Sequence, residues 1–116
     1  MTLEADLLAC LDVLVNGRVY SDIGPPDVVK PYITYQQVGG DAIKLLGNEM
    51  PDKRNARIQV NIWSTTRMEA NGLMRQAETL LVTSTVLLAE AQTALTANYE
   101  PETKLYGAFQ FFSIWS

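Results

Sequence analysis

The sequence predicts an α+β domain, in which a mostly antiparallel sheet carries two helices packed on one face and extends into a long β-hairpin arm. Three observations lead to this fold class. Two segments carry apolar residues at helical spacing, and several others alternate apolar and polar residues, as half-buried strands do. The segments follow in the order helix, three strands, helix, three strands. The simplest arrangement of that order is one sheet with both helices on the same side.

The first helix is expected over residues 2–15. Leu3, Leu7 and Leu11 recur at the spacing of one helical face, which gives the helix an apolar side to bury. The Asn16-Gly17 pair should end it, because glycine tolerates the left-handed conformation that closes many helices.

Two strands are expected next, over residues 18–20 and 32–38, with an irregular proline-containing loop between them. The clearest strand covers residues 57–64. Ile58, Val60 and Ile62 alternate there with polar residues, so we expect these three side chains to face the helices.

The segment 39–56 joins two of these strands and is longer than most connections in a compact domain. It contains the Gly39-Gly40 pair and a short apolar patch formed by Ile43, Leu45 and Leu46. We interpret it as a long hairpin extension, the arm of the predicted fold.

A second helix should start after Thr66, because Thr66 and Glu69 have the spacing of a capping box. Gly72 within it costs about 1 kcal/mol against alanine, which suggests close packing against a neighbour. Residues 86–91, which also allow a helical reading, and residues 93–99 are strand candidates.

The last strand is expected over residues 104–115. Its alternation places Leu105, Phe109, Phe111 and Trp115 on one face. Tyr106, Phe112 and Ile114 then lie on the other.

Size and composition indicate one domain spanning residues 1–116. Apolar residues make up 47% of the chain and charged residues 19%, which excludes a disordered tail. The net charge of −4 lacks the basic footprint of a nucleic-acid-binding protein, so direct nucleic-acid binding is not expected. The N-terminus lacks a signal-peptide pattern, and no apolar run approaches the roughly 20 residues of a membrane span. We therefore expect a soluble protein made in a cytoplasm, with no membrane partner.

The residue inventory argues against catalysis. The chain has no histidine and a single cysteine, Cys10, so it lacks the usual general base, the usual zinc ligands and the partner of a serine or cysteine nucleophile. Its glycines are not followed by the Gly-Lys-Ser/Thr of a phosphate-binding loop. No catalytic residue, cofactor or metal is therefore expected, although an enzyme that uses two carboxylates remains an alternative.

A strand that is apolar on both faces must be covered on both sides. If the helices cover one face only, the other face needs a partner, and the arm with its basic residues offers a second contact. An acidic surface around Asp22 and Asp27 of an adjacent subunit could meet these basic residues. The candidate interface residues are Ile43, Leu45, Leu46, Lys53, Arg54, Arg57, Trp63, Tyr106, Phe112 and Ile114.

Three stretches resemble the tail completion, or tail terminator, family of long-tailed bacteriophages, which includes proteins similar to minor tail protein U of lambda-like phages. The first is Gly-Arg-Val-Tyr at 17–20, followed by the proline-containing loop. The second is Pro-Tyr-Ile-Thr-Tyr-Gln at 31–36, and the third is Ala-Arg-Ile-Gln-Val-Asn-Ile-Trp-Ser at 56–64, which leads into the capped helix. With the first helix, the resemblance covers residues 3–81.

The resemblance implies a virion structural protein, from a phage or prophage, that forms a ring, commonly a hexamer, at the head-proximal end of the tail. Its partners would be copies of itself, the tail tube protein and head–tail connector proteins. It would be located in the virion tail, and in the host bacterial cytoplasm during assembly. Besides the carboxylate enzyme, two alternatives remain open: another head–tail connector or neck protein, and a cytosolic small-molecule-binding α+β domain.

Overall fold

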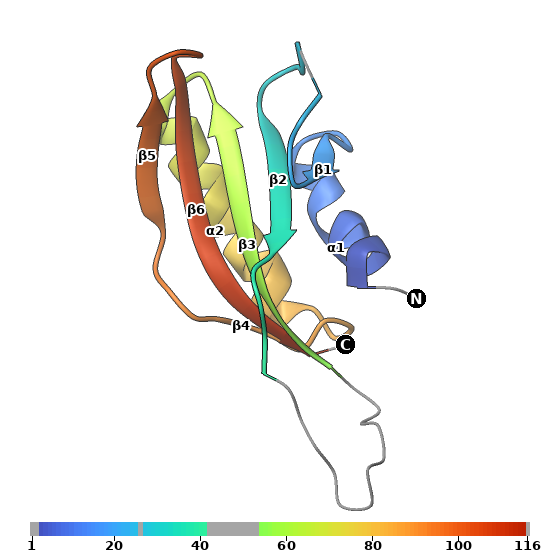
Figure 1. Cartoon of the computed structure of the whole chain (residues 1–116). Helices are drawn as coiled ribbons and strands as arrows, with labels where there is room; N and C mark the ends of the chain where they lie inside the picture. The colour runs from blue at the N-terminus through green and yellow to red at the C-terminus, as the bar shows by residue number, and fades with distance from the viewer. Residues whose placement is uncertain (1–2, 26, 42–53, 116) are drawn as a thin grey trace, which may run out of the picture.

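The computed structural model describes residues 3–25, 27–41 and 54–115. Within these residues, two helices, a short 3₁₀ helix and six strands follow one another (Figure 1). Their bounds are α1 Leu3–Leu11, η1 Asp12–Leu14, β1 Val19–Ser21, β2 Tyr32–Gln37, β3 Asn55–Ser64, α2 Arg67–Thr83, β4 Ala89–Ala91, β5 Thr96–Glu100 and β6 Leu105–Trp115.

The six strands form one sheet in the order β1-β2-β3-β6-β4, and β5 pairs with β6 beyond the stretch that β4 occupies. Every pair is antiparallel except β1 with β2. The longest pairing joins β3 to β6 at the centre of the sheet, with Val60 opposite Gln110. The predicted α+β class with a mostly antiparallel sheet is confirmed.

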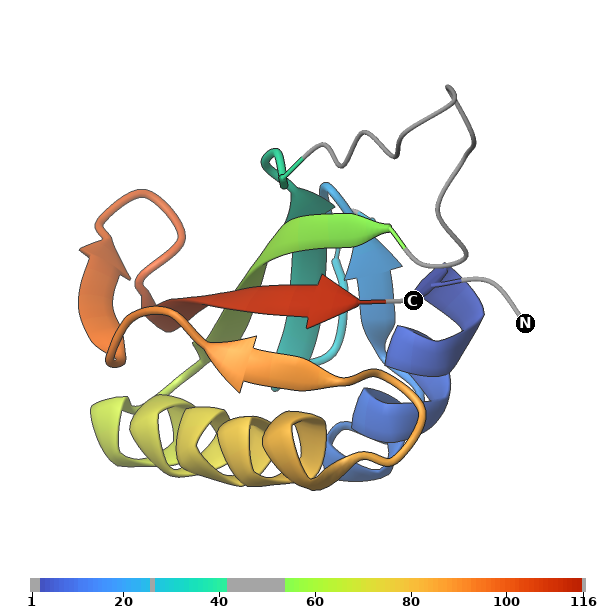
Figure 2. The ribbon, with the colours of Figure 1, turned by 90° about the horizontal axis from the view of Figure 1, so that it is seen from below.

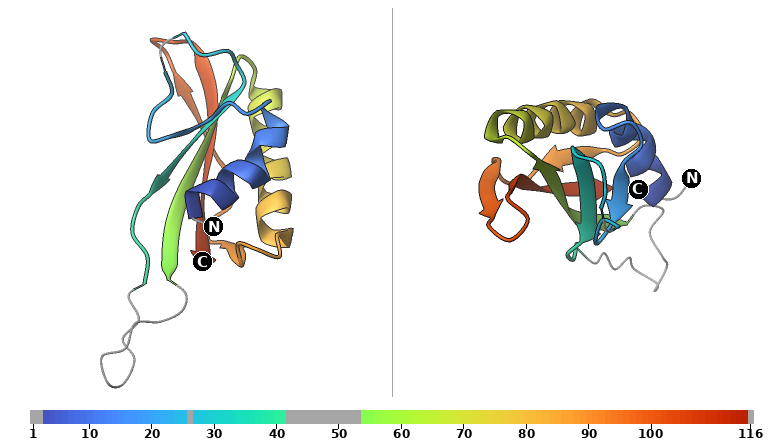
Figure 3. Two further views of the ribbon diagram at one scale, coloured as in Figure 1. Left: turned by 90° about the vertical axis from the view of Figure 1, so that its right-hand side faces the viewer. Right: turned by 90° about the horizontal axis from the view of Figure 1, so that it is seen from above.

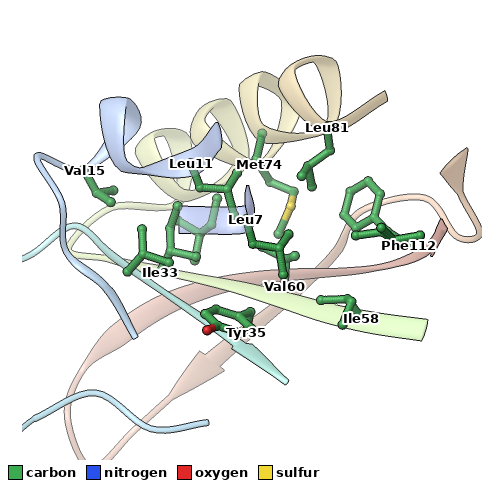
Figure 4. Packing of buried hydrophobic residues seen from close by; sticks show 14 of the residues in the cluster. Leu7, Leu11, Val15, Ile33, Tyr35, Ile58, Val60, Met74, Leu81 and Phe112 are labelled. Carbon is green, nitrogen blue, oxygen red and sulfur yellow. The ribbon is translucent and has the colours of Figure 1, made fainter. Parts of the chain in front are cut away.

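Both helices cover the same face of the sheet, as Figure 2 and both views of Figure 3 show. Between the layers lies one core, in which Leu7 and Leu11 of α1 and Met74 of α2 pack toward the buried side chains of β3 (Figure 4). Ile58, Val60 and Ile62 belong to this core, so the expected orientation of β3 is confirmed.

The first helix is shorter than expected, because its last turn tightens into η1. The N–H groups of Val15 and Gly17 both donate to the carbonyl oxygen of Asp12, at 3.2 and 2.9 Å. Asn16 and Gly17 then adopt positive φ angles of 50° and 81°, which confirms the predicted termination.

Only one of the two hydrogen bonds of the predicted capping box forms at the start of α2. The Thr66 hydroxyl accepts a hydrogen bond from the Glu69 N–H at 3.2 Å, as an N-cap should. The Glu69 carboxylate does not return to the Thr66 N–H but accepts from the Ser64 hydroxyl, which itself accepts from the Thr66 N–H. Ser64, the last residue of β3, therefore links the strand to the helix.

The expectation of close packing at Gly72 is wrong. A methyl group at this position would find no side chain, and no backbone atom outside its own helix, within 4 Å.

Gly72→Ala should therefore raise the free energy of unfolding by about 0.5–1 kcal/mol, because alanine restricts the unfolded chain and meets no clash. Urea denaturation of both proteins measures this. A lower stability of the variant would contradict the open environment at Gly72.

The strand expected at 86–91 is reduced to β4, which starts only at Ala89. The Ser84 hydroxyl accepts from the N–H groups of Val86 and Leu87, both at 3.2 Å, and so holds a turn where the strand was expected. Leu87 is fully buried in this turn.

The predicted arm falls largely outside the residues described. Its base is described, since Val38 donates to the carbonyl oxygen of Arg57 and Arg57 donates to that of Gly39, both at 2.8 Å. Residues 42–53, which include Ile43, Leu45, Leu46 and Lys53, lie outside the described part of the chain.

Candidate functional site

The side of the sheet that faces away from the helices, here called the open face, has no helix over it in the described part of the chain (Figures 2 and 3). Strand alternation gives it the half-buried side chains of β3 and β6, which the core excludes. These are Arg57, Gln59, Asn61 and Trp63 of β3 with Phe109, Phe111 and Trp115 of β6.

Aromatic rings and one cation occupy the middle of the open face. The rings of Phe109 and Phe111 meet edge to face, with centroids 6.1 Å apart and planes at 83°. The Arg57 guanidinium lies 4.4 Å from the centroid of Phe111, a cation–π distance. The buried Arg57 Nε has no hydrogen-bond partner among the described residues. This arginine is therefore packed as part of the sheet surface.

Polar side chains beside the rings are hydrogen-bonded to one another. The amide of Gln59 donates to Asn61 at 3.0 Å, and the amide of Asn61 donates to the Thr34 hydroxyl at 3.3 Å. Asn55 likewise donates to the Ser113 hydroxyl at 2.8 Å. Because these groups already have partners, a protein that covers the open face would not leave them unsatisfied.

Trp63 lies across Gly107 on the neighbouring strand. A Cβ atom at Gly107 would lie 2.7 Å from Cζ3 of Trp63 and 2.2 Å from Oδ1 of Asn98, so a side chain there would displace both. The indole therefore covers the glycine, as an aromatic ring does when it shields a glycine in a sheet. The expected place of Trp63, away from the helices, is confirmed.

A polar hollow of about 680 Å³ lies at the end of the open face nearest the arm. Arg57 and Glu90 occupy opposite sides of it, because both pair in register with Ser113 of the strand between them. Asn55 and Thr93 add further polar groups to its lining. The hollow places charged groups of both signs beside the aromatic surface.

The expected faces of the last strand must be corrected. Phe112 and Ile114 are fully buried in the core, opposite Ile58 and Ala56 of β3, and so face the helices. Tyr106 packs against the same core, under the start of α2. These three side chains do not belong to the open face.

The register of β3 against β6 decides these faces, because the core face of β3 determines which face of β6 joins it. The open-face aromatics of β6 that the prediction missed are Phe109, Phe111 and Trp115. The alternation in the sequence places these three residues on one face of β6. It does not show which face of the strand the helices cover.

The basic residues expected at the base of the arm differ in position and exposure. Arg57 lies within the open face, whereas Arg54 is exposed. Lys53 lies outside the described residues.

The described side chains contain no group of three or more histidine, cysteine, aspartate or glutamate residues that could hold a metal ion. Burial raises the pKa of the Cys10 thiol, which keeps it protonated and poorly nucleophilic at neutral pH. Burial also raises the pKa of Tyr32 and of Tyr35.

Of the helices in the described part of the chain, none has the length and apolar character that crossing a membrane requires.

The comparison with known families decides the identity. The family model for tail completion protein gp17 matches residues 5–116. The chain belongs to this family. The resemblance seen in the sequence is therefore confirmed, and as a tail completion protein the chain is a structural protein associated with the virion tail.

Among solved structures, the tail completion fold is similar to a chain of the virion of a native gene transfer agent particle. The TM-score is 0.64 at 15% sequence identity, and the similarity covers 97% of this chain and 87% of the other. At this identity the comparison supports the fold. No curated protein matches the chain.

Proposed function

We propose that this tail completion protein, acting as one domain over residues 1–116, forms a ring at the head-proximal end of the tail and joins the tail to the head. The family match over residues 5–116 carries the proposal. The fold shared with a chain of a gene transfer agent virion supports a role within a particle.

The surface supports assembly in a ring. A ring subunit contacts its neighbours through two different patches, because each copy meets the next in a head-to-tail manner. The exposed apolar side chains of the β1–β2 loop, Ile23 and Val29, and the exposed Val13 on the helix side belong to two such unlike surfaces. A hexamer is the proposed state, with the tail tube protein and head–tail connector proteins above and below it.

The oligomeric state in solution tests this proposal. Light scattering after size-exclusion chromatography should show a mass that rises with protein concentration toward six times 12.9 kDa, and electron microscopy should show closed rings. Purified tail tubes should bind the protein at one end. A chain that remains monomeric at all concentrations, with and without tail tubes, would contradict ring formation. Binding to the connector alone would favour a neck protein instead.

A further inference from the structure

An apolar groove of about 440 Å³ lies between η1 and α2 and opens to solvent. It is lined by Val13, Leu14, Arg75, Gln76, Thr79 and Leu80. Val13 is 72% exposed at its edge, which leaves a large apolar side chain uncovered. The groove lies in the helix layer, on the opposite side of the molecule from the open face.

The groove is suited to an apolar side chain with an acidic neighbour. The Thr79 hydroxyl donates to the backbone carbonyl of Arg75 at 3.1 Å, so it does not require a partner in the groove. The Arg75 side chain is exposed beside it, and its guanidinium has no acidic partner among the described residues. A matching surface would therefore combine an apolar side chain with carboxylates.

The loop between β1 and β2 carries such a surface. Ile23 and Val29 are 81% and 64% exposed. Asp22, which precedes Ile23, and Asp27, two residues before Val29, are exposed as well. We call these four residues the acidic tip. The loop therefore carries two large exposed apolar side chains and two negative charges.

The acidic tip is held in place by the sheet. The Asp22 N–H donates to the carbonyl oxygen of Tyr35 at 2.8 Å, which extends the β1–β2 pairing into the loop. Gly24 packs against the ring of Tyr32, where a Cβ atom would lie 2.9 Å from the ring carbon Cε2. A loop already ordered in the free subunit loses less entropy when it binds. The hydrogen bond and the ring contact hold Asp22 and Gly24 against β2.

We propose that the acidic tip of one copy of this protein binds in the helix-side groove of the next copy, with Ile23 against Val13 and Leu80 and the two aspartates beside Arg75. This contact rests on the proposed ring function and identifies its subunit interface. It is head-to-tail, since the tip and the groove are different surfaces of one chain. Burial of Ile23 provides affinity, and the charges fix the orientation.

Disulfide trapping tests the contact. Two variants are made in a Cys10→Ala background, one with Ile23→Cys and one with Val13→Cys, and are mixed under mildly oxidising conditions. We expect heterodimers in the mixture and none from either variant alone, because each contact needs one tip and one groove. A chain with both cysteines should form a ladder that ends at the ring size.

The outcomes separate this contact from the ring itself. Rings of wild-type protein with no trapping in the mixture would overturn the tip–groove contact and leave the proposed function intact. Dimers from Ile23→Cys alone would overturn the contact as well, because they indicate a symmetric interface. A wild-type chain that never assembles would overturn both proposals.

A charge reversal adds a second readout. Arg75→Glu should raise the protein concentration needed for assembly by about tenfold or more while preserving the circular dichroism spectrum, because it places a like charge beside the aspartates. Lys104→Glu is the matched control, since it reverses an exposed positive charge in the turn between β5 and β6, and it should assemble as wild type does. Arg54→Glu, at the exposed base of the arm, tests the rival contact of the acidic tip. If Arg54→Glu blocks assembly and Arg75→Glu does not, the acidic tip binds the arm base and the groove contact is wrong.

Discussion

Replacing Val60 with aspartate is expected to unfold the protein. Val60 is completely buried at the centre of β3, between Tyr35 of β2 and Gln110 of β6, and its side chain points to the core beneath α1 and α2 (Figure 4). An aspartate there would bury a carboxylate without a partner, at a cost on the order of 5 kcal/mol. A domain of this kind is stable by about 5–15 kcal/mol in total. Circular dichroism and thermal melting of the variant would show the loss.

Gln59→Asp is the matched control for Val60→Asp. It introduces the same side chain one residue earlier on the same strand, but on the half-exposed open face. We expect it to lose only the hydrogen bond from Gln59 to Asn61, and therefore to fold. A Val60→Asp variant that melts as wild type does would show that this face of β3 is not the core.

Replacing Arg67 with alanine is expected to destabilise the protein by about 2–3 kcal/mol, because the Arg67 guanidinium donates several hydrogen bonds. Arg67, the first residue of α2, donates to the carbonyl oxygens of Gly107 in β6 and Asn98 in β5 and to the Asn71 side chain. Its guanidinium also lies 5.3 Å from the centroid of the Tyr106 ring. Chemical denaturation monitored by tryptophan fluorescence measures the change, since Trp63 contacts Gly107.

Arg67→Lys separates charge from geometry. Lysine keeps the positive charge but lacks the planar fork that reaches two carbonyl oxygens at once, so we expect it to recover less than half of the loss. Equal stability of the lysine variant and wild type would show that charge alone holds α2 to β5 and β6. An alanine variant as stable as wild type would contradict the linking role of Arg67.

The candidate site was only partly predictable. Trp63 was placed correctly because its strand has an unambiguous alternation, with three branched aliphatic residues on one side. Phe112 and Ile114 were placed on the wrong face, since both faces of β6 carry large apolar residues. The sequence predicts an acidic surface around Asp22 and Asp27 but not the exposed Ile23 and Val29 beside it in the chain. It does not predict the groove. The groove is formed by residues far apart in the sequence, on η1 and α2.

The local structure and the fold class can be read from the sequence alone. Helical spacing, strand alternation, the Thr66 cap and the left-handed ending at Asn16-Gly17 depend on neighbouring residues, and such signals can be read without a partner. The three family-like stretches likewise indicate a tail structural protein from the sequence alone.

Which surfaces remain free to bind a partner depends instead on how the strands and helices pack. The pairing of Ile58 with Phe112 turns Phe109 and Phe111 outward, and a shift of that register by one residue would exchange the two faces. Likewise, Val13 and Leu80 form a groove only because η1 packs beside α2. Register and packing are set by the sum of many long-range contacts, so neither can be derived from the local pattern of one segment.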